Sequence, residues 1–243
     1  DIIMKLVNRA GEDVYLTQGN TFENDQNLAE SALKQLRERY SGTRLGRQEL
    51  YAELLDDVEG ALWSYKSIEA TRISHDNAPD LDRIVVSIDP AVTNTEQSDE
   101  TGIIVAGLGV DNRYYVIDDV SGRMSPDGWG RLAIDMFYKY QADRIVAEVN
   151  NGRDLVERLL RNIDDTVPYT PVRASRGKLV RAEPIAALYE QEKVCHVGLF
   201  RELEDQLCSY SATSVKSPDR LDALVWALTE LSQSSGKAYW RIG

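Results

Sequence analysis

The sequence predicts an α/β domain built on a mixed sheet, with an antiparallel hairpin, parallel strands and helices on both faces. Two observations support this prediction. Strand-like runs follow one another between about residues 83 and 120, and helix-like and strand-like segments then alternate up to residue 231. Consecutive strands indicate an antiparallel part, whereas alternation is typical of strands joined by helical crossovers.

A small helical linker is expected before this domain. The first residue is not Met, and a strand-like run at 13–17 has no preceding domain to pack on, so we expect a piece of a longer chain. Apolar residues at helical spacing predict a helix over 28–40, and a second short helix is expected over about 47–55. The polar segment that ends near Pro79 predicts a domain boundary near residue 80, which divides the chain into 1–80 and 81–243.

The domain after this boundary begins with three predicted strands. Residues 84–88 are β-branched and nearly all apolar, as in a central buried strand. Runs at 102–109 and 113–120 are joined by Val110-Asp-Asn, which predicts an antiparallel hairpin. The remaining expected elements are helices at 125–140, from the turn at Gly152 to about 161, at 182–192, 199–208 and 218–231, and strands at 144–148 and 167–172.

The composition indicates a globular chain. Of its 243 residues 42% are hydrophobic, and neither a spanning apolar run nor a basic-then-apolar leader is present, so we expect a soluble, intracellular protein. Cys195 and Cys208 lack CxxC spacing, and with the isolated His75 and His196 they cannot build a zinc cage. We expect buried thiols.

The charge is unevenly distributed along the chain. A net charge of −12 is unusual for a protein that binds DNA, because phosphate contacts are usually made through a basic face. One local basic cluster nevertheless contains Arg173, Arg176, Lys178 and Arg181. This cluster could contact phosphates, or it could be an ordinary solvated face.

Four acids stand where strands end or where the last helix begins. Asp89 ends the first predicted strand, Glu148 ends the fourth, and Asp219 and Asp222 open the last helix. Strand ends on one edge of a sheet converge, and residues three apart share a helical face, so these acids could form one site. Clustered carboxylates repel one another unless a cation neutralises them, and oxygen donors suit Mg²⁺ or Mn²⁺. Taken singly, each acid could instead cap a helix or form a turn.

Five motifs, in this order, resemble the nuclease domain of phage terminase large subunits. They are Ser87-Ile-Asp-Pro-Ala91, Asp99-Glu-Thr-Gly-Ile-Ile104, Val146-Ala-Glu-Val-Asn150, Gly177-Lys-Leu-Val-Arg-Ala182 and Ser217-Pro-Asp-Arg-Leu-Asp-Ala-Leu224. The resemblance covers essentially residues 10 to 231, and upstream it includes the family's segment between the packaging ATPase and the nuclease. It implies an RNase H-like fold, related to Holliday-junction resolvases and retroviral integrases. The chain contains no G-x-x-x-x-G-K-[ST] loop, so no ATP hydrolysis is expected.

The resemblance also implies roles for individual residues. Asp89 and Glu148 correspond to the first two metal ligands, and the third is Asp222 or Asp219, with Asp222 slightly ahead. Asp99 resembles an auxiliary acid of some relatives. Lys178 and Arg181 are implied to face phosphate, and the DNA-binding cluster further includes Arg173 and Arg176.

The function that follows is cleavage of concatemeric viral double-stranded DNA by a water activated by two Mg²⁺ or Mn²⁺ ions. Asp89 would bridge the ions, Glu148 and Asp222 would hold one each, and Asp219 would assist. The implied partners in the intact motor are DNA, the small terminase subunit and the portal, with no membrane. The implied location is the host cytoplasm, at the procapsid during packaging.

Three alternatives remain at this point. A nuclease similar to Holliday-junction resolvases would share the acids but not the upstream motif. A catalytically silent module that holds DNA and docks the motor would use the acids as caps or ion-pair residues. A nucleotide-binding protein of the actin-like fold is disfavoured, because no glycine-rich phosphate loop follows the first strand or the hairpin.

Overall fold

A computed structural model of the chain describes residues 6, 9–11, 13–15, 17, 19–34, 50–52, 60–90, 100–149, 153–174, 177–211 and 218–234. The chain forms two compact units, Asp1–Asp56 and Asp57–Gly243. In the first unit, the 3₁₀ helix η1 (Thr21–Asn27) precedes a helical segment at 30–34, inside the range predicted as a helix. The rest of that helix and most of the helix expected at 47–55 lie outside the described residues.

The second unit is built on a six-stranded mixed sheet with the strand order β5-β4-β1-β2-β3-β6. The strands are β1 (Leu81–Asp89), β2 (Gly102–Gly109), β3 (Tyr114–Asp119), β4 (Arg144–Glu148), β5 (Tyr169–Val172) and β6 (Val194–His196). The β1–β2 and β2–β3 pairs are antiparallel, and the other three pairs are parallel. This confirms the predicted mixed sheet and hairpin. The edge strand β6 was not predicted, because three residues are too few to show a strand periodicity.

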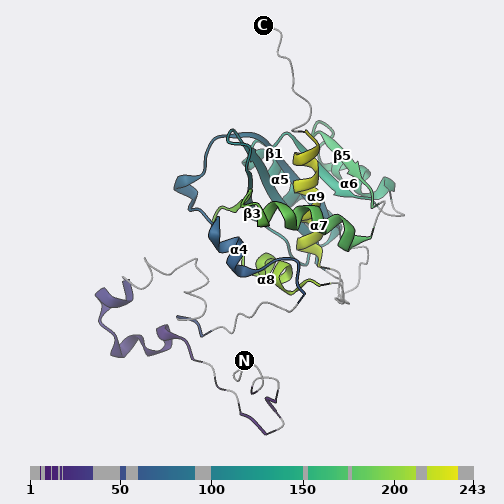
Figure 1. Ribbon diagram of the computed structural model, residues 1–243. Coiled ribbons are helices and arrows are strands. Elements are labelled where there is room, and N and C mark those ends of the chain that lie inside the picture. Colours follow the sequence, from purple (N-terminus) through teal and green to yellow (C-terminus); the bar gives the residue numbers. More distant parts are fainter. Residues whose placement is uncertain are drawn as a thin grey trace. The chain divides into compact units, whose positions relative to one another are not determined.

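Helices cover both faces of this sheet (Figure 1). They are α5 (Pro126–Lys139), α6 (Arg153–Ile163), α7 (Lys178–Glu190), α8 (Arg201–Ser209) and α9 (Asp219–Ser234), with α4 (Tyr65–Ala70) and η2 (His75–Asn77) before β1. Helix α9 contacts β1, β2 and β4, and α7 packs on α9. Helix α5 contacts β1, β4 and α6. Among the described helices, none has the length and apolar character needed to cross a membrane.

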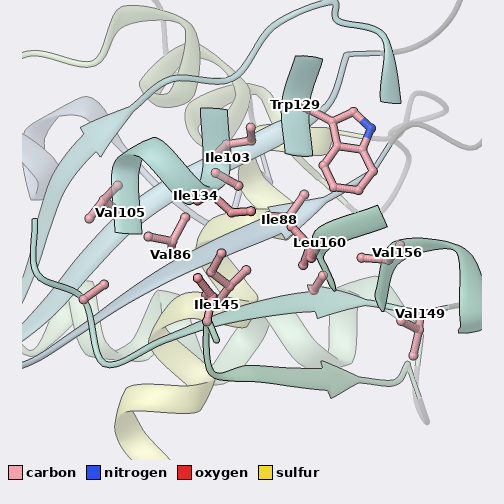
Figure 2. Close-up of a cluster of buried hydrophobic side chains, with 14 residues drawn as sticks. Val86, Ile88, Ile103, Val105, Trp129, Ile134, Ile145, Val149, Val156 and Leu160 are labelled. Atoms are coloured by element: carbon pink, nitrogen blue, oxygen red, sulfur yellow. The ribbon is translucent and has the colours of Figure 1, made fainter. Parts of the chain in front are cut away.

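The two faces of the sheet are distinguished by alternate side chains. A buried apolar cluster packs Val86 and Ile88 of β1 and Ile145 of β4 against Trp129 of α5 and Leu160 of α6 (Figure 2). Because successive side chains of a strand point to opposite faces, the residues between these positions point to the face that α9 covers. The predicted buried thiols are confirmed, since both cysteines are free and buried.

Two helix starts affect the functional part of the chain. Helix α5 begins as predicted, with Pro126 at its start and the Oγ of Ser125 accepting a hydrogen bond from the backbone N–H of Gly128. Helix α7 begins at Lys178 rather than at residue 182 and continues through Pro184. A proline favours the first turn of a helix, so the sequence indicated a start close to Pro184. The earlier start places Lys178 and Arg181 in the first turn of α7.

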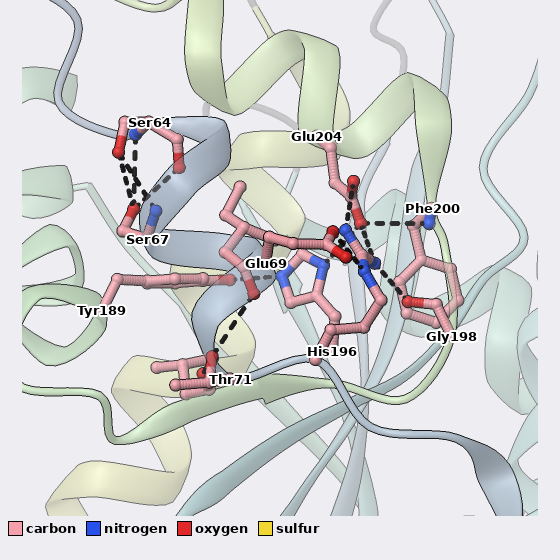
Figure 3. A network of polar contacts seen from close by, with 12 residues as sticks. Ser64, Ser67, Glu69, Thr71, Tyr189, His196, Gly198, Phe200 and Glu204 are labelled. Atoms are coloured by element: carbon pink, nitrogen blue, oxygen red, sulfur yellow. Dashed lines mark hydrogen bonds and ion pairs between the residues drawn. The ribbon is translucent and has the colours of Figure 1, made fainter. Parts of the chain in front are cut away.

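A buried polar network joins the residues before β1 to the sheet domain (Figure 3). Arg72, which follows α4, forms a bidentate ion pair with Glu204 of α8, with Nη1–Oε1 and Nη2–Oε2 distances of 2.7 and 2.9 Å. The same Glu204 Oε1 lies 3.0 Å from Nδ1 of the fully buried His196, whose Nε2 is hydrogen-bonded to Tyr189. The boundary predicted near residue 80 therefore differs from the structure, which groups residues 57–80 with the sheet domain. The polar character of this segment is partly that of a buried network and not of a solvated linker.

Candidate functional site

Asp89 and Glu148 lie at the carboxyl ends of two neighbouring parallel strands. The register of β1 and β4 pairs Ser87 with Val146 and Ile88 with Ala147, so one further step places Asp89 beside Glu148. Both acids alternate with residues of the buried cluster under α5, and they therefore point to the α9 side of the sheet. The sheet thus brings the first two predicted acids together.

Gly102 allows the start of α9 to pack against the sheet beside Asp89. It is the partner of Asp89 in the β1–β2 ladder. A Cβ atom at this position would lie only 2.6 Å from the carbonyl carbon of Asp219 and 3.0 Å from the Cβ of Ala223. Only glycine permits so close an approach of helix to strand. The approach carries Asp219 and the buried Asp222 to the edge where Asp89 ends.

The acids share one electrostatic environment. Burial raises the pKa of Asp89 well above its ordinary value, and the charges of Asp222, Glu148 and Asp219 raise it further, while Lys178 opposes them. Burial also raises the pKa of Asp222, against the opposing effects of Lys178 and Arg181. Like charges crowded in a partly desolvated site create a demand for positive charge.

The first turn of α7 supplies positive charge at this place. Lys178 Nζ donates a hydrogen bond to Oδ2 of Asp222. Arg181 Nη1 lies 3.3 Å from Oε2 of Glu148, and its Nη2 lies 3.7 Å from Oδ1 of Asp222. Burial works to lower the pKa of Lys178, but the hydrogen bond to Asp222 and the nearby carboxylates outweigh burial and raise it. Lys178 is therefore a cation throughout the physiological pH range.

Two further residues hold the start of α9, and the sequence did not identify either of them. The buried Arg220 places Nη1 2.8 Å from Oδ2 of Asp119 and Nε 3.2 Å from Oε2 of Glu100. Gln206 of α8 accepts hydrogen bonds through Oε1 from the backbone N–H groups of Arg220 (3.0 Å) and Leu221 (3.3 Å). A side chain from another helix thus satisfies amides that the first turn of α9 leaves unpaired. The sequence carries no local signal for such a cap.

The chain matches the family model described as the terminase RNaseH-like domain over residues 86–231, which is more than half of its length. The chain belongs to this family. No curated protein matches the sequence.

Solved structures of terminases share the fold of this RNaseH-like domain. The human cytomegalovirus terminase nuclease domain is 16% identical, with 68% of this chain and 91% of that chain covered and a TM-score of 0.51. For the large terminase of a thermophilic bacteriophage the values are 14%, 87%, 55% and 0.54. For the nuclease domain of the large terminase subunit gp2 of bacterial virus Sf6 they are 12%, 69%, 98% and 0.54. The cytomegalovirus domain is also known in a Mn-soaked, inhibitor-bound structure, and the present chain spans 55% of the thermophilic phage protein.

Most of the predicted site residues of this terminase domain meet at one place. The residues brought together are Asp89, Glu148, Asp219, Asp222, Lys178 and Arg181. Their individual roles stay predictions. Arg173 follows β5 and is exposed, whereas Asp99 and Arg176 lie outside the described residues.

The site fits divalent cations in its chemistry. Its donors are carboxylate oxygens, which Mg²⁺ and Mn²⁺ prefer, and the crowding around Asp89 is a charge imbalance that a cation relieves. Within the described part of the chain, no three His, Cys, Asp or Glu side chains are arranged to hold an ion as they stand. Lys178 and Arg181 occupy contacts to the same carboxylates, so the carboxylates must rearrange slightly to become ligands.

Proposed function

We propose that this domain is a metal-dependent endonuclease that cleaves concatemeric viral double-stranded DNA during packaging. One observation carries the proposal: the carboxylates of Asp89, Glu148 and Asp222 meet at the edge of the sheet, beside the cations Lys178 and Arg181. Membership of the terminase RNaseH-like family supports the packaging context.

Asp89, Glu148 and Asp222 would hold two Mg²⁺ or Mn²⁺ ions, with Asp219 assisting. Such ions, when bound, would supply an activated water and neutralise the charge that develops on the phosphate and the leaving oxygen. The Mn-soaked cytomegalovirus relative supports the use of Mn²⁺. Among the neighbouring acids, Asp222 has the strongest effect on the pKa of Asp89 and Asp219 the weakest, which supports Asp222 as the third ligand.

The cations of α7 have a separate role in this proposal. In the structure Lys178 and Arg181 contact Asp222 and Glu148. Once these carboxylates are neutralised by other means, both cations are available to donate hydrogen bonds to phosphate oxygens and so position the scissile bond. Phosphate contacts carry no sequence information, so we expect cleavage that is nearly independent of DNA sequence.

The wider setting is also a proposal. The small terminase subunit and the portal would be partners of the full-length protein, which would act in the host cytoplasm at the procapsid. This setting is supported by the family alone. Because the chain spans 55% of the large terminase from the thermophilic bacteriophage, DNA translocation belongs to a longer protein.

The test is plasmid cleavage with Mn²⁺, Mg²⁺ or EDTA by the unsubstituted protein, Asp89→Asn and Asp222→Asn. Asp164→Asn is the matched control, because Asp164 follows α6 and bonds only Tyr138 and Thr166 among its printed partners in the described chain. We expect metal-dependent nicking and linearisation by the unsubstituted protein and the control, and no cleavage by the two site variants. Cleavage in EDTA, or cleavage that persists in either site variant, would contradict the proposal.

A catalytically silent DNA-holding module is the second candidate. It is favoured by the ion pairs that Lys178 and Arg181 form with the carboxylates in the structure. This candidate predicts that the protein binds DNA, is not stabilised by Mn²⁺ and cuts no plasmid. A resolvase-like nuclease would instead cut four-way junctions in preference to linear duplexes.

A further inference from the structure

Trp226 touches the functional site through its indole N–H. It lies on α9, one helical turn after Asp222, and is buried, so the sequence alone indicated a core residue. In the structure its Nε1 donates a 2.7 Å hydrogen bond to Oε2 of Glu148. Trp226 therefore links the last helix to the carboxylate at the end of β4.

The two oxygens of Glu148 have different surroundings. Oε2 accepts from both Trp226 Nε1 and Arg181 Nη1, at 2.7 and 3.3 Å. Within the described residues, no hydrogen bond to Oε1 is found. A carboxylate that is anchored through one oxygen has a fixed orientation and offers the other oxygen to a further ligand.

Trp226 also holds the neighbouring cation. The guanidinium carbon of Arg181 lies 4.4 Å from the centre of the indole ring, within the range of a cation–π interaction. The Nε of Arg181 is buried without a hydrogen-bond partner in the described part of the chain. The ring thus supports Arg181 in a position where hydrogen bonds satisfy only part of the guanidinium.

The other buried tryptophan with a described N–H environment provides a contrast. Trp63 is as buried as Trp226, and its Nε1 has no hydrogen-bond partner among the described residues. Burial of an indole in this fold therefore does not require a carboxylate partner. The bond from Trp226 to Glu148 calls for a separate explanation.

We propose that Trp226 is a positioning residue of the nuclease site, which fixes Glu148 through Oε2 so that Oε1 serves as the ligand of a divalent cation. This inference rests on the proposed function, since it presupposes an ion at Glu148. The indole N–H orients the carboxylate, and the ring keeps Arg181 beside it. Loss of a partner that orients a metal ligand typically weakens metal binding by about 10- to 100-fold.

The test compares Trp226→Phe, which keeps an aromatic ring but removes the N–H, with Trp63→Phe, which removes an N–H that has no partner among the described residues. Mn²⁺ affinity is measured by isothermal calorimetry and by the electron paramagnetic resonance of free Mn²⁺, with folding checked by circular dichroism. We expect about 10- to 100-fold weaker Mn²⁺ binding in Trp226→Phe. Trp63→Phe should keep the affinity of the unsubstituted protein.

A second measurement avoids any dependence on the folding of Trp226→Phe. In protein with ¹⁵N-labelled indoles, Mg²⁺ should shift one N–H resonance, and that resonance should persist in Trp63→Phe, Trp129→Phe and Trp240→Phe. Equal Mn²⁺ affinity in Trp226→Phe and Trp63→Phe, or no shift of such a resonance, overturns the positioning role while the proposed nuclease stands. Failure of the unsubstituted protein to bind Mn²⁺ overturns both.

Discussion

The close approach of α9 to β2 at Gly102 leads to a quantitative prediction for Gly102→Ala. The added methyl carbon would lie 2.6 Å from the carbonyl carbon of Asp219 and 3.0 Å from the Cβ of Ala223. Ordinary carbon–carbon contacts are about 3.5 to 4.0 Å, so the start of α9 must move away from the sheet by roughly 1 Å. This movement carries Asp219 and Asp222 away from Asp89.

The expected effect on stability combines two opposing contributions. Overpacking of this kind costs about 1 to 3 kcal/mol. Replacing a strand glycine by alanine returns roughly 0.5 to 1 kcal/mol, because alanine loses less backbone freedom on folding. The net loss is about 1 to 2 kcal/mol, which corresponds to a urea midpoint lower by about 0.5 to 1 M for a slope of about 2 kcal/mol per M. Metal-dependent nicking should fall further, by about 100-fold, since a misplacement of about 1 Å at a site can cost that much.

The assay is urea unfolding in EDTA together with plasmid nicking in Mn²⁺. Gly122→Ala is the matched control, because a Cβ at Gly122 would lie 3.9 Å from its nearest neighbour, the Cε of Met124. The control should unfold and cut like the unsubstituted protein. If Gly102→Ala does the same, the reasoning that the approach at Gly102 positions the acids of α9 is wrong.

Three further predictions concern buried groups. Glu204→Gln should lower the free energy of unfolding at pH 7 by roughly 3 to 5 kcal/mol, because Arg72 then stays buried without its charged partner, whereas the exposed Glu202→Gln should have little effect. Burial works to raise the pKa of Glu204, but His196 and Arg72 outweigh burial and lower it to about 2. The stabilisation is therefore complete above the ordinary pKa of glutamate and is lost as the pH falls towards 2, so urea titrations should show the two proteins converging below pH 4. Asp89→Asn should raise the unfolding temperature in EDTA, because the raised pKa of Asp89 means that its ionised form destabilises the folded state above the ordinary pKa of aspartate. Calorimetry from pH 4 to pH 8 should show this advantage growing with pH, and an advantage that shrinks would refute the argument. Gln206→Ala should cost about 1 kcal/mol of stability and weaken Mn²⁺ binding, because the start of α9 loses its cap, while Gln191→Ala at the exposed end of α7 should leave Mn²⁺ binding unchanged.

The sequence was most informative where one local pattern decides the outcome. The β-branched run before Asp89 and the apolar run before Glu148 marked two strands, and the acids at their ends could be selected without a structure. Parallel strands with these ends on one edge necessarily bring the acids close. The last helix was also recognisable, because its apolar residues recur at helical spacing.

The sequence was less informative where short elements or irregular starts are involved. Strand β6 depends on pairing with β3, and the segment around Arg72 depends on Glu204, which lies far along the chain. Pro184 suggested a later start for α7 than the one observed, so the cations of its first turn were inferred from the family resemblance and not from the helix. In each instance a tertiary contact overrides or replaces the local preference.

Local patterns therefore determined the order of strands and helices, the buried faces and the candidate acids, because periodicity and strand-end positions are properties of neighbouring residues. Tertiary packing alone decided that Gly102 admits α9 and that Gln206 caps it. It also decided that Trp226 meets Glu148, from which it is separated by 78 positions. Such contacts join residues whose sequence environments are independent of each other, and a hydrogen bond between them is specified only when the whole sheet and its helices are assembled.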